Sequence, residues 1–500
     1  MAGRPNVLVV VLDCVRESDF RPSSDGSYLP HLHRLAPEFV RYDRTLSPAS
    51  WTLPSHASLF SGLYPWEHGM TTLSGLKATP DYHSIAGYLR SQGYASVSIS
   101  ANFLIGTTLG IVNDFDSAYW GGWWEPYFRY SLPYDLLSRW LTRFPLDRET
   151  TRGPRADPQT GIPGLLRRHS SGILRHVYVL DFLNRLSRGL SGSRTPPRVS
   201  SWLEPTLGRW LARQPAEKPV FAFINLLDAH EPYFSGSDVR GWTDWWRYSR
   251  LPQERWGWID GSTRVSPPEL EPLHRVYRDM IRILDERVAH IVEQFKSAGR
   301  WDNTLMVLTS DHGQAFGEHG HLFHAMGVEQ ELTHVPLWVH YPGGEGGGQS
   351  VDQWASLVDV VPTILDVLGQ EGRMRSSGFT LRKISERSRP SPVYSVSDGY
   401  GHQLPPAISE LRKIDEPPIA VAACAGEWKV IVDHNGDKDT SRAFNIHHDP
   451  KEQEDVWKGQ DPKVAELGEK AQEAVSLLLH RKRTPPTQEI MERLASWGYT

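Results

Sequence analysis

The stretch Asn6-Val7-Leu8-Val9-Val10-Val11-Leu12, followed directly by Asp13, decides the fold class. An unbroken run of β-branched and aliphatic residues is typical of a strand buried on both faces of a parallel sheet. Similar runs recur at Ala95–Ser100, Val220–Leu227, Thr304–Ser310 and Val335–His340. Helical patterns lie between them, as at His83–Gln92 and Leu273–Phe295. This alternation predicts an α/β fold, with a large central, mostly parallel sheet sandwiched by helices.

The chain is expected to hold a main α/β domain over residues 1–375 and a smaller α+β subdomain over residues 376–500. Three short strand candidates and a final helical pattern mark the second part: Pro392–Ser397, Ile419–Ala423, Trp428–Val432 and Lys463–His480.

Residues 121–217 differ from the rest of the main domain. They contain fifteen arginines, eight acidic residues and no lysine, together with several tryptophans. One interpretation is a helical insertion whose arginines are solvated or paired with acidic groups. The other is a lid, or a docking surface for an anionic or lipid-like substrate, which includes contact with a membrane surface.

Composition excludes several classes of protein. Of the 500 residues 39% are hydrophobic and 23% charged, which describes a globular chain, neither disordered nor collagen-like. A formal charge of −5 gives no overall attraction to nucleic acid. Cys14 and Cys424 cannot form a disulfide framework, and we find neither a secretion signal nor a long apolar span. These features predict a cytoplasmic protein.

Polar side chains follow several of the predicted strands: Asp13, Asn102, Asp228 with His230, and Asp311 with His312. In open α/β sheets the ligand crevice lies beyond the carboxyl ends of the strands. A single aspartate there often caps a helix. Two carboxylates and an imidazole together favour a divalent cation such as Mg²⁺, Mn²⁺, Ca²⁺ or Zn²⁺.

Thr52 precedes Pro54 at a predicted helix start. A hydroxyl at this place lies beside backbone N–H groups that favour an anion. The alternative is a capping threonine with no chemical role.

These segments together resemble the sulfatase-like branch of the alkaline phosphatase superfamily. The resemblance is carried in chain order by Arg4–Asp13, Thr52–Gly62, Leu227–Tyr233, Thr309–Gly320, His334–Leu337, Asp359–Thr363 and Phe444–Pro450. It spans nearly the whole chain apart from residues 121–217, and it implies the large-sheet fold of that superfamily.

The resemblance implies a role for individual residues. Asp13, Asp311 and His312 would bind a divalent metal, and Thr52 would be both nucleophile and metal ligand. His230 would lie near the leaving group. The residues implied in substrate binding are Asn102, His324 and His56.

Two residues depart from the sulfatase pattern. Sulfatases oxidise a Cys or Ser to formylglycine, whereas oxidation of Thr52 would give a ketone, so no formylglycine is expected. Cys14 stands where typical sulfatases have another acidic ligand, which implies fewer charges at the metal, or a thiolate ligand to Zn²⁺.

We therefore expect a metal-dependent hydrolase or transferase acting on phosphoric or sulfuric esters through Thr52, with phosphoesters favoured. The substrate would be an anionic ester of a small molecule, a glycan or a lipid headgroup. One alternative is a sulfuric ester hydrolase working without formylglycine. Another is a non-catalytic binder of an anionic sugar or lipid. A second metal is compatible with the sequence if two or three of His319, His321 and His334 converge.

Overall fold

The computed structural model describes residues 3–121, 200–231, 267–386, 391–398, 419–435, 438–457 and 461–481. Most of the arginine-rich segment, residues 122–199, lies outside the described residues. The predicted lid or docking surface falls on these residues and stays a prediction. Among the described helices, none combines the length and the apolar character needed to cross a membrane.

The larger of the sheets has eight strands in the order β10-β2-β9-β6-β1-β5-β3-β4. Their bounds are β1 Asn6–Leu12, β2 Val40–Leu46, β3 Ala95–Ser100, β4 Ser117–Trp120, β5 Val220–Leu226, β6 Thr304–Thr309, β9 Leu337–His340 and β10 Ser350–Ser356. All neighbouring pairs are parallel except those that β9 makes with β2 and β6. The large, mostly parallel sheet is therefore confirmed.

Strand β1 lies near the middle of this sheet and is buried along its whole length. Val7, Val9 and Val11 join the core on one face, and Leu8, Val10 and Leu12 join the core on the other. Because both faces are covered, the strand needs apolar residues on both of them.

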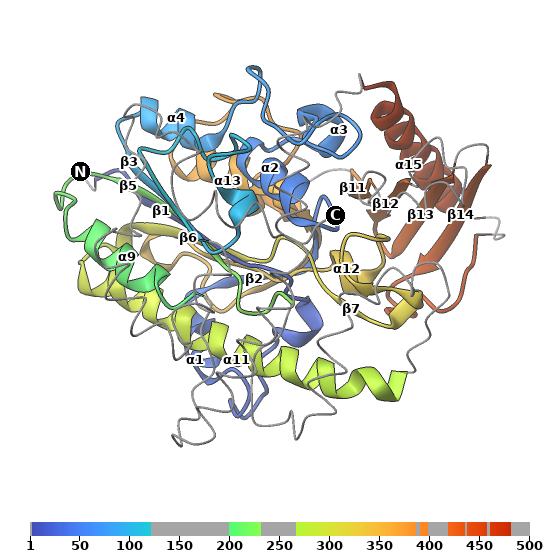
Figure 1. The fold of residues 1–500 in the computed structure, drawn as a ribbon, viewed down its shortest axis with the longest axis horizontal. Coiled ribbons are helices and arrows are strands. Elements are labelled where there is room, and N and C mark those ends of the chain that lie inside the picture. Colours follow the sequence, from blue (N-terminus) through green and yellow to red (C-terminus); the bar gives the residue numbers. More distant parts are fainter. Residues whose placement is uncertain are drawn as a thin grey trace, which may run out of the picture.

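Helices cover the two faces in separate groups (Figure 1). The first group is α2 (Thr52–Ser61), α4 (Ile85–Ser91) and α13 (Val360–Val367). The second is α1 (Pro30–Leu35), α9 (Leu203–Leu211) and α11 (Pro267–Ser297). The helices predicted at His83–Gln92 and Leu273–Phe295 correspond to α4 and α11.

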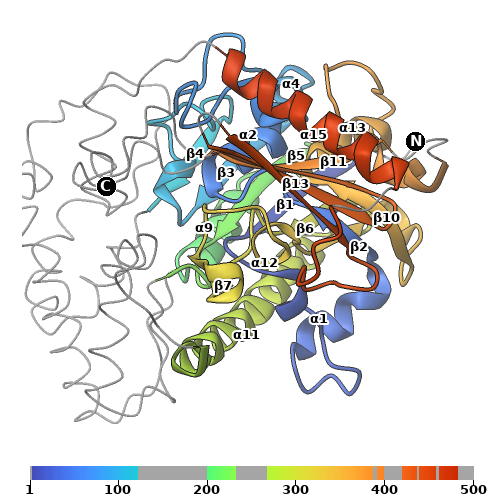
Figure 2. The same cartoon turned by 90° about the vertical axis from the view of Figure 1, so that its right-hand side faces the viewer.

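The C-terminal part forms an antiparallel sheet with one long helix. Its strands are β11 (Val393–Ser397), β12 (Ile419–Ala425), β13 (Trp428–Asn435) and β14 (Lys438–Asn445), in that order. Helix α15 (Pro462–His480) packs across β12 and β13, as Figure 2 shows from the side of that helix. The predicted small subdomain is therefore present as a sheet that begins at Val393.

The two parts meet directly before α2. The backbone N–H of Ser50 donates to the Val396 carbonyl at 3.1 Å, and Trp51 Nε1 donates to Asp398 Oδ1 at 2.7 Å. The small sheet therefore supports the segment that leads into Thr52.

Candidate active site

Three parallel strands deliver side chains to one place at the carboxyl edge of the large sheet. Asp13 follows β1, and its Oδ2 accepts from Asn102 Nδ2 at 2.9 Å and from Asn225 Nδ2 at 3.3 Å. Asn102 follows β3, and Asn225 lies in β5 next to β1. Because the strands run parallel, residues far apart in the chain surround a single buried carboxylate.

Asp311 and His312 follow β6 on the other side of β1. His312 Nε2 lies 3.8 Å from Asp13 Oδ1 and 3.4 Å from Asp311 Oδ2. His312 Nδ1 lies 2.9 Å from the Gly313 carbonyl. A proton on Nδ1 donated to this carbonyl leaves the lone pair of Nε2 directed between the two carboxylates.

Thr52 is the first residue of α2, and Trp51 occupies the N-cap position without a side-chain cap. The Thr52 hydroxyl therefore does not cap its helix. Its Oγ1 lies 3.3 Å from His312 Nε2 and 3.5 Å from Asn102 Nδ2. The structure thus brings the predicted nucleophile to the predicted metal-binding group.

Cys14 adopts a left-handed backbone conformation with φ of 65°. Such a conformation is unusual for a residue with a side chain and is often found at functional sites. The turn lets the Cys14 N–H donate to Asp311 Oδ1 at 3.3 Å and places Sγ 3.4 Å from Asp13 Oδ1. It also brings the thiol 3.7 Å from His324 Nδ1.

His56 lies one turn after Thr52 and is fully buried. Its Nδ1 is 2.9 Å from the Thr52 carbonyl, and its Nε2 accepts from Asn225 at 3.0 Å. Both ring nitrogens therefore contact protein groups. Because both nitrogens are occupied, the predicted direct contact of His56 with substrate does not fit this geometry. His56 instead positions Thr52 through its backbone carbonyl.

His230 and His324 lie beside each other, with ring centroids 4.9 Å apart. His230 Nδ1 lies 2.5 Å from the Glu231 backbone carbonyl and 3.5 Å from the Glu231 carboxylate. His324 Nδ1 lies 2.9 Å from Gln314 Oε1 and 3.6 Å from Glu231 Oε2. The rings of His324 and His312 are 4.5 Å apart, so this pair adjoins the Asp13 and Asp311 carboxylates.

Burial controls the protonation of these groups. Loss of hydration lowers the pKa of His312 to about 3 and that of His56 to about 4, so both rings are neutral near neutral pH. Burial and the nearby charge of Asp13 raise the pKa of Asp311 well above the usual range. Burial and the charges of neighbouring carboxylates likewise raise the pKa of the Cys14 thiol.

These groups fit a bound divalent cation. Asp13, Asp311 and His312 are fully buried, and Asp311 Oδ2 has no hydrogen-bond donor among the described residues. Two adjacent desolvated carboxylates repel each other, and a cation between them would remove that penalty. Their oxygens, the His312 nitrogen and the Thr52 hydroxyl form a donor set suited to Mg²⁺, Mn²⁺, Ca²⁺ or Zn²⁺.

Sequence reasoning missed three residues of the site. Asn225 supports both Asp13 and His56, while Gln314 and Glu231 contact His324. Asn225 could have been found, because it is a polar residue near the end of an apolar strand. The same pattern led to the prediction of Asn102.

The three histidines considered for a second metal each contact a different partner. His319 pairs with Glu331, His321 pairs with Glu329, and His334 contacts the Asp43 carbonyl. None of these partners belongs to the Asp13 and Asp311 group.

The chain is similar to known proteins over most of its length. The Sulfatase family model matches residues 5–370. Arylsulfatase K of Xenopus laevis is 25% identical over 360 residues, which cover 65% of this chain and 65% of that protein. The N-acetylglucosamine-6-O-sulfatase of Bacteroides thetaiotaomicron is 23% identical over 511 residues, covering 95% of this chain and 86% of the relative.

Solved structures support the fold. A phosphonate monoester hydrolase from Silicibacter pomeroyi superposes with a TM-score of 0.63 at 19% identity, covering 96% of each chain. This likeness shows the fold, and the family match over residues 5–370 shows that the chain belongs to the sulfatase family.

Proposed function

We propose that this chain is a metal-dependent hydrolase or transferase that cleaves phosphoric or sulfuric esters through the Thr52 hydroxyl, with phosphoesters favoured. Membership of the sulfatase family supports cleavage of an ester bond. The observation that carries the role of Thr52 is its position at the start of α2, with Oγ1 3.3 Å from His312 Nε2 and beside the Asp13 and Asp311 carboxylates.

In this proposal Asp13, Asp311, His312 and Thr52 would hold the cation. When bound, a divalent cation supplies positive charge that lowers the pKa of a coordinated hydroxyl and polarises the ester. The first turn of α2 adds a favourable dipole for a negative oxygen at Thr52. Asn102 Nδ2 directs a hydrogen-bond donor at the same oxygen.

The Thr52 hydroxyl loses its proton to solvent, and Oγ1 forms a bond to the phosphorus or sulfur of the ester while the bond from that atom to the departing oxygen breaks. His230 gives that oxygen a proton as general acid. The Glu231 carboxylate lies 3.5 Å from His230 Nδ1 and helps to orient the ring. Water or an acceptor alcohol then releases the product from Thr52.

The side chain of residue 52 favours phosphoesters over sulfate esters. A hydroxyl nucleophile leaves an ester that is released by a second attack at the central atom. A formylglycine hydrate avoids that attack when it releases sulfate, but threonine cannot form the aldehyde. Phosphorus is the atom at which a second displacement is the usual chemistry of hydroxyl nucleophiles.

Sulfate ester hydrolysis without formylglycine is the second candidate. It is favoured by the likeness to the N-acetylglucosamine-6-O-sulfatase, which spans 95% of this chain and suggests an anionic ester of a glycan.

The test is a comparison of parent, Thr52→Ala and Thr52→Ser proteins on nitrophenyl phosphate, a nitrophenyl phosphodiester and nitrophenyl sulfate, each with added Mn²⁺ or Zn²⁺. We expect activity with a phosphate ester that Thr52→Ala abolishes and Thr52→Ser partly retains. Undiminished activity of Thr52→Ala would contradict the proposal for every substrate.

A further inference from the structure

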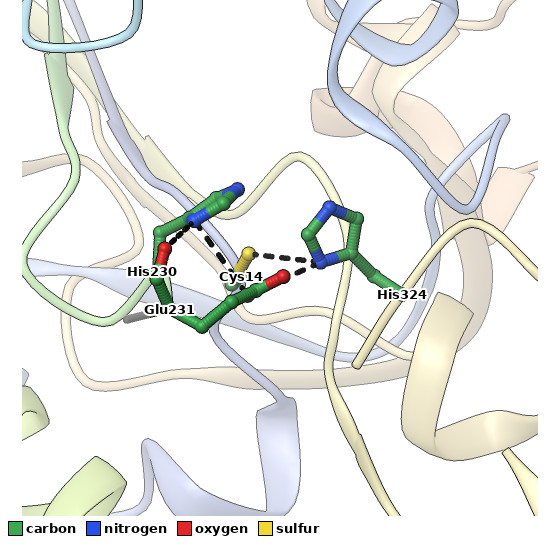
Figure 3. Close-up of side chains that lie close together, drawn as sticks. All are labelled: Cys14, His230, Glu231 and His324. Atoms are coloured by element: carbon green, nitrogen blue, oxygen red, sulfur yellow. Dashed lines mark hydrogen bonds and ion pairs between the residues drawn. The ribbon is translucent and has the colours of Figure 1, made fainter. Parts of the chain in front are cut away.

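Three side chains beside the Asp13 and Asp311 carboxylates direct ligand atoms at one another. The Cys14 sulfur and the Glu231 carboxylate both face Nδ1 of His324, and His230 lies next to them (Figure 3). Cys14 Sγ is 3.7 Å from this nitrogen and Glu231 Oε2 is 3.6 Å from it. One ligand atom from each of the four residues can be chosen so that all four atoms lie within 4.8 Å of one another.

These separations match a tetrahedral zinc site closely. With zinc bonds of about 2.3 Å to sulfur and about 2.0 to 2.1 Å to nitrogen or oxygen, tetrahedral ligands stand roughly 3.3 to 3.6 Å apart. The 3.6 Å between Glu231 Oε2 and His324 Nδ1 lies at the upper end of this range, and the 3.7 Å between Cys14 Sγ and His324 Nδ1 lies just above it. Thiolate, imidazole and carboxylate are also a donor set that suits Zn²⁺ much better than Mg²⁺ or Ca²⁺.

We propose that Cys14, Glu231 and His324 form a second cation site, selective for zinc, with an open fourth position facing the reacting ester. The site deepens the proposed function, because it adds a second positive charge next to the group that Thr52 would attack. Three protein ligands with one open position are the usual arrangement of catalytic zinc.

The Gln314 side chain bridges two of the proposed ligands. Its Oε1 lies 2.9 Å from His324 Nδ1, and its Nε2 donates to Glu231 Oε2 at 2.7 Å. One amide therefore contacts the two ligand atoms that the cation would join. Zinc binding would release Gln314 from these contacts, and the thiol proton would leave to solvent.

His230 stays outside the proposed site. A proton on its Nδ1 donates to the Glu231 carbonyl 2.5 Å away, so that nitrogen has no free lone pair. Its Nε2 is buried without a hydrogen-bond partner among the described residues. His230 therefore remains available to the departing oxygen while Glu231 binds the cation through its side chain.

The test is a titration of chelator-treated full-length protein with Co²⁺, which replaces zinc and gives a near-ultraviolet charge-transfer band when a thiolate is a ligand. We expect two bound Co²⁺ per parent chain and the thiolate band with one of them. Cys14→Ser should lose both the band and one equivalent. Cys424→Ser removes the other buried thiol, which lies in β12, and should keep both.

His324→Gln and Glu231→Gln distinguish this site from ligation of Cys14 to the first metal. We expect both variants to bind a single Co²⁺ without the thiolate band. A band that persists in His324→Gln with one Co²⁺ per chain would place Cys14 on the metal of Asp13 and His312, and would overturn the proposal. So would a parent protein that binds one Co²⁺ and shows no band.

The outcome is separable from that of the proposed function. Thr52→Ala should keep the thiolate band, since Thr52 is no ligand of the second site. Full ester hydrolysis by Thr52→Ala would refute the role of Thr52 and leave the cobalt result standing. Far-ultraviolet circular dichroism of each variant shows that it is folded.

Discussion

Replacing Asp311 with asparagine should stabilise the metal-free protein while removing its response to metal. Asp311 is fully buried beside Asp13, and both burial and that neighbouring charge raise its pKa well above the usual range. The folded state therefore holds a proton that the unfolded chain has lost. Unfolding releases this proton, so the stability of the metal-free protein falls as pH rises above the ordinary aspartate value.

Asparagine removes this penalty because it is neutral at every pH. Its amide oxygen still accepts from the backbone N–H groups of Cys14 and His312, as Asp311 Oδ1 does. Each unit by which the Asp311 pKa is raised is equivalent to about 1.4 kcal/mol. In chelator at about pH 8, Asp311→Asn should therefore exceed the parent in free energy of unfolding, by up to about 1.4 kcal/mol for each unit of that shift.

Added metal should make the parent more stable than Asp311→Asn. A cation present at roughly 100 times its Kd stabilises the parent by about 2.7 kcal/mol, and Asp311→Asn should gain little. The assay is denaturant unfolding of both proteins in chelator and in excess Mn²⁺. If Asp311→Asn is the less stable protein in chelator at about pH 8, the carboxylates are not held in a repulsive pair and the reasoning fails.

Three further predictions concern groups around the site. Hydrogen bonding to Glu331 raises the pKa of His319 to about 9. The stability that His319 adds relative to His319→Gln should therefore be complete below about pH 6.5 and be lost as pH rises through about 9. Denaturant unfolding of both proteins at several pH values would measure this difference. Asp398→Ala removes the acceptor of the buried Trp51 indole N–H, which should cost about 1–3 kcal/mol of stability. It should also lower kcat by displacing the start of α2, and an unchanged kcat would refute this effect on catalysis. Asn102→Ala removes a donor to the reacting oxygen and should lower kcat by about 10²-fold in steady-state assays, whereas a change confined to KM would contradict this role.

The sequence was sufficient for the parts of the fold that are set by local pattern. The largely apolar run at Asn6–Leu12 predicts β1 to the residue, because a strand covered on both faces is apolar at most of its positions. The approach of Asp13 to Asp311 and His312 then follows from parallel neighbours sharing one edge. Strand direction was less accessible: nothing in the run at Val335–His340 marks β9 as antiparallel, and the structure shortens it to Leu337–His340.

The supporting contacts of the site could not be predicted, because they join positions far apart in the chain through side-chain geometry. His56 contacts Asn225, which is 169 residues away, and this contact turns a predicted substrate-binding histidine into a support for Thr52. The nearness of Cys14 to His324 depends on the left-handed turn at Cys14, and no glycine marks that turn in the sequence.

The most direct test of the role of Thr52 is to quench the protein with acid during turnover of a phosphate or sulfate ester and to sequence its peptides by mass spectrometry. We predict a phosphoryl or sulfuryl group on Thr52 of the parent protein, and none on any residue of Thr52→Ala. Steady turnover by the parent with the adduct on another residue, together with unchanged turnover by Thr52→Ala, would contradict it.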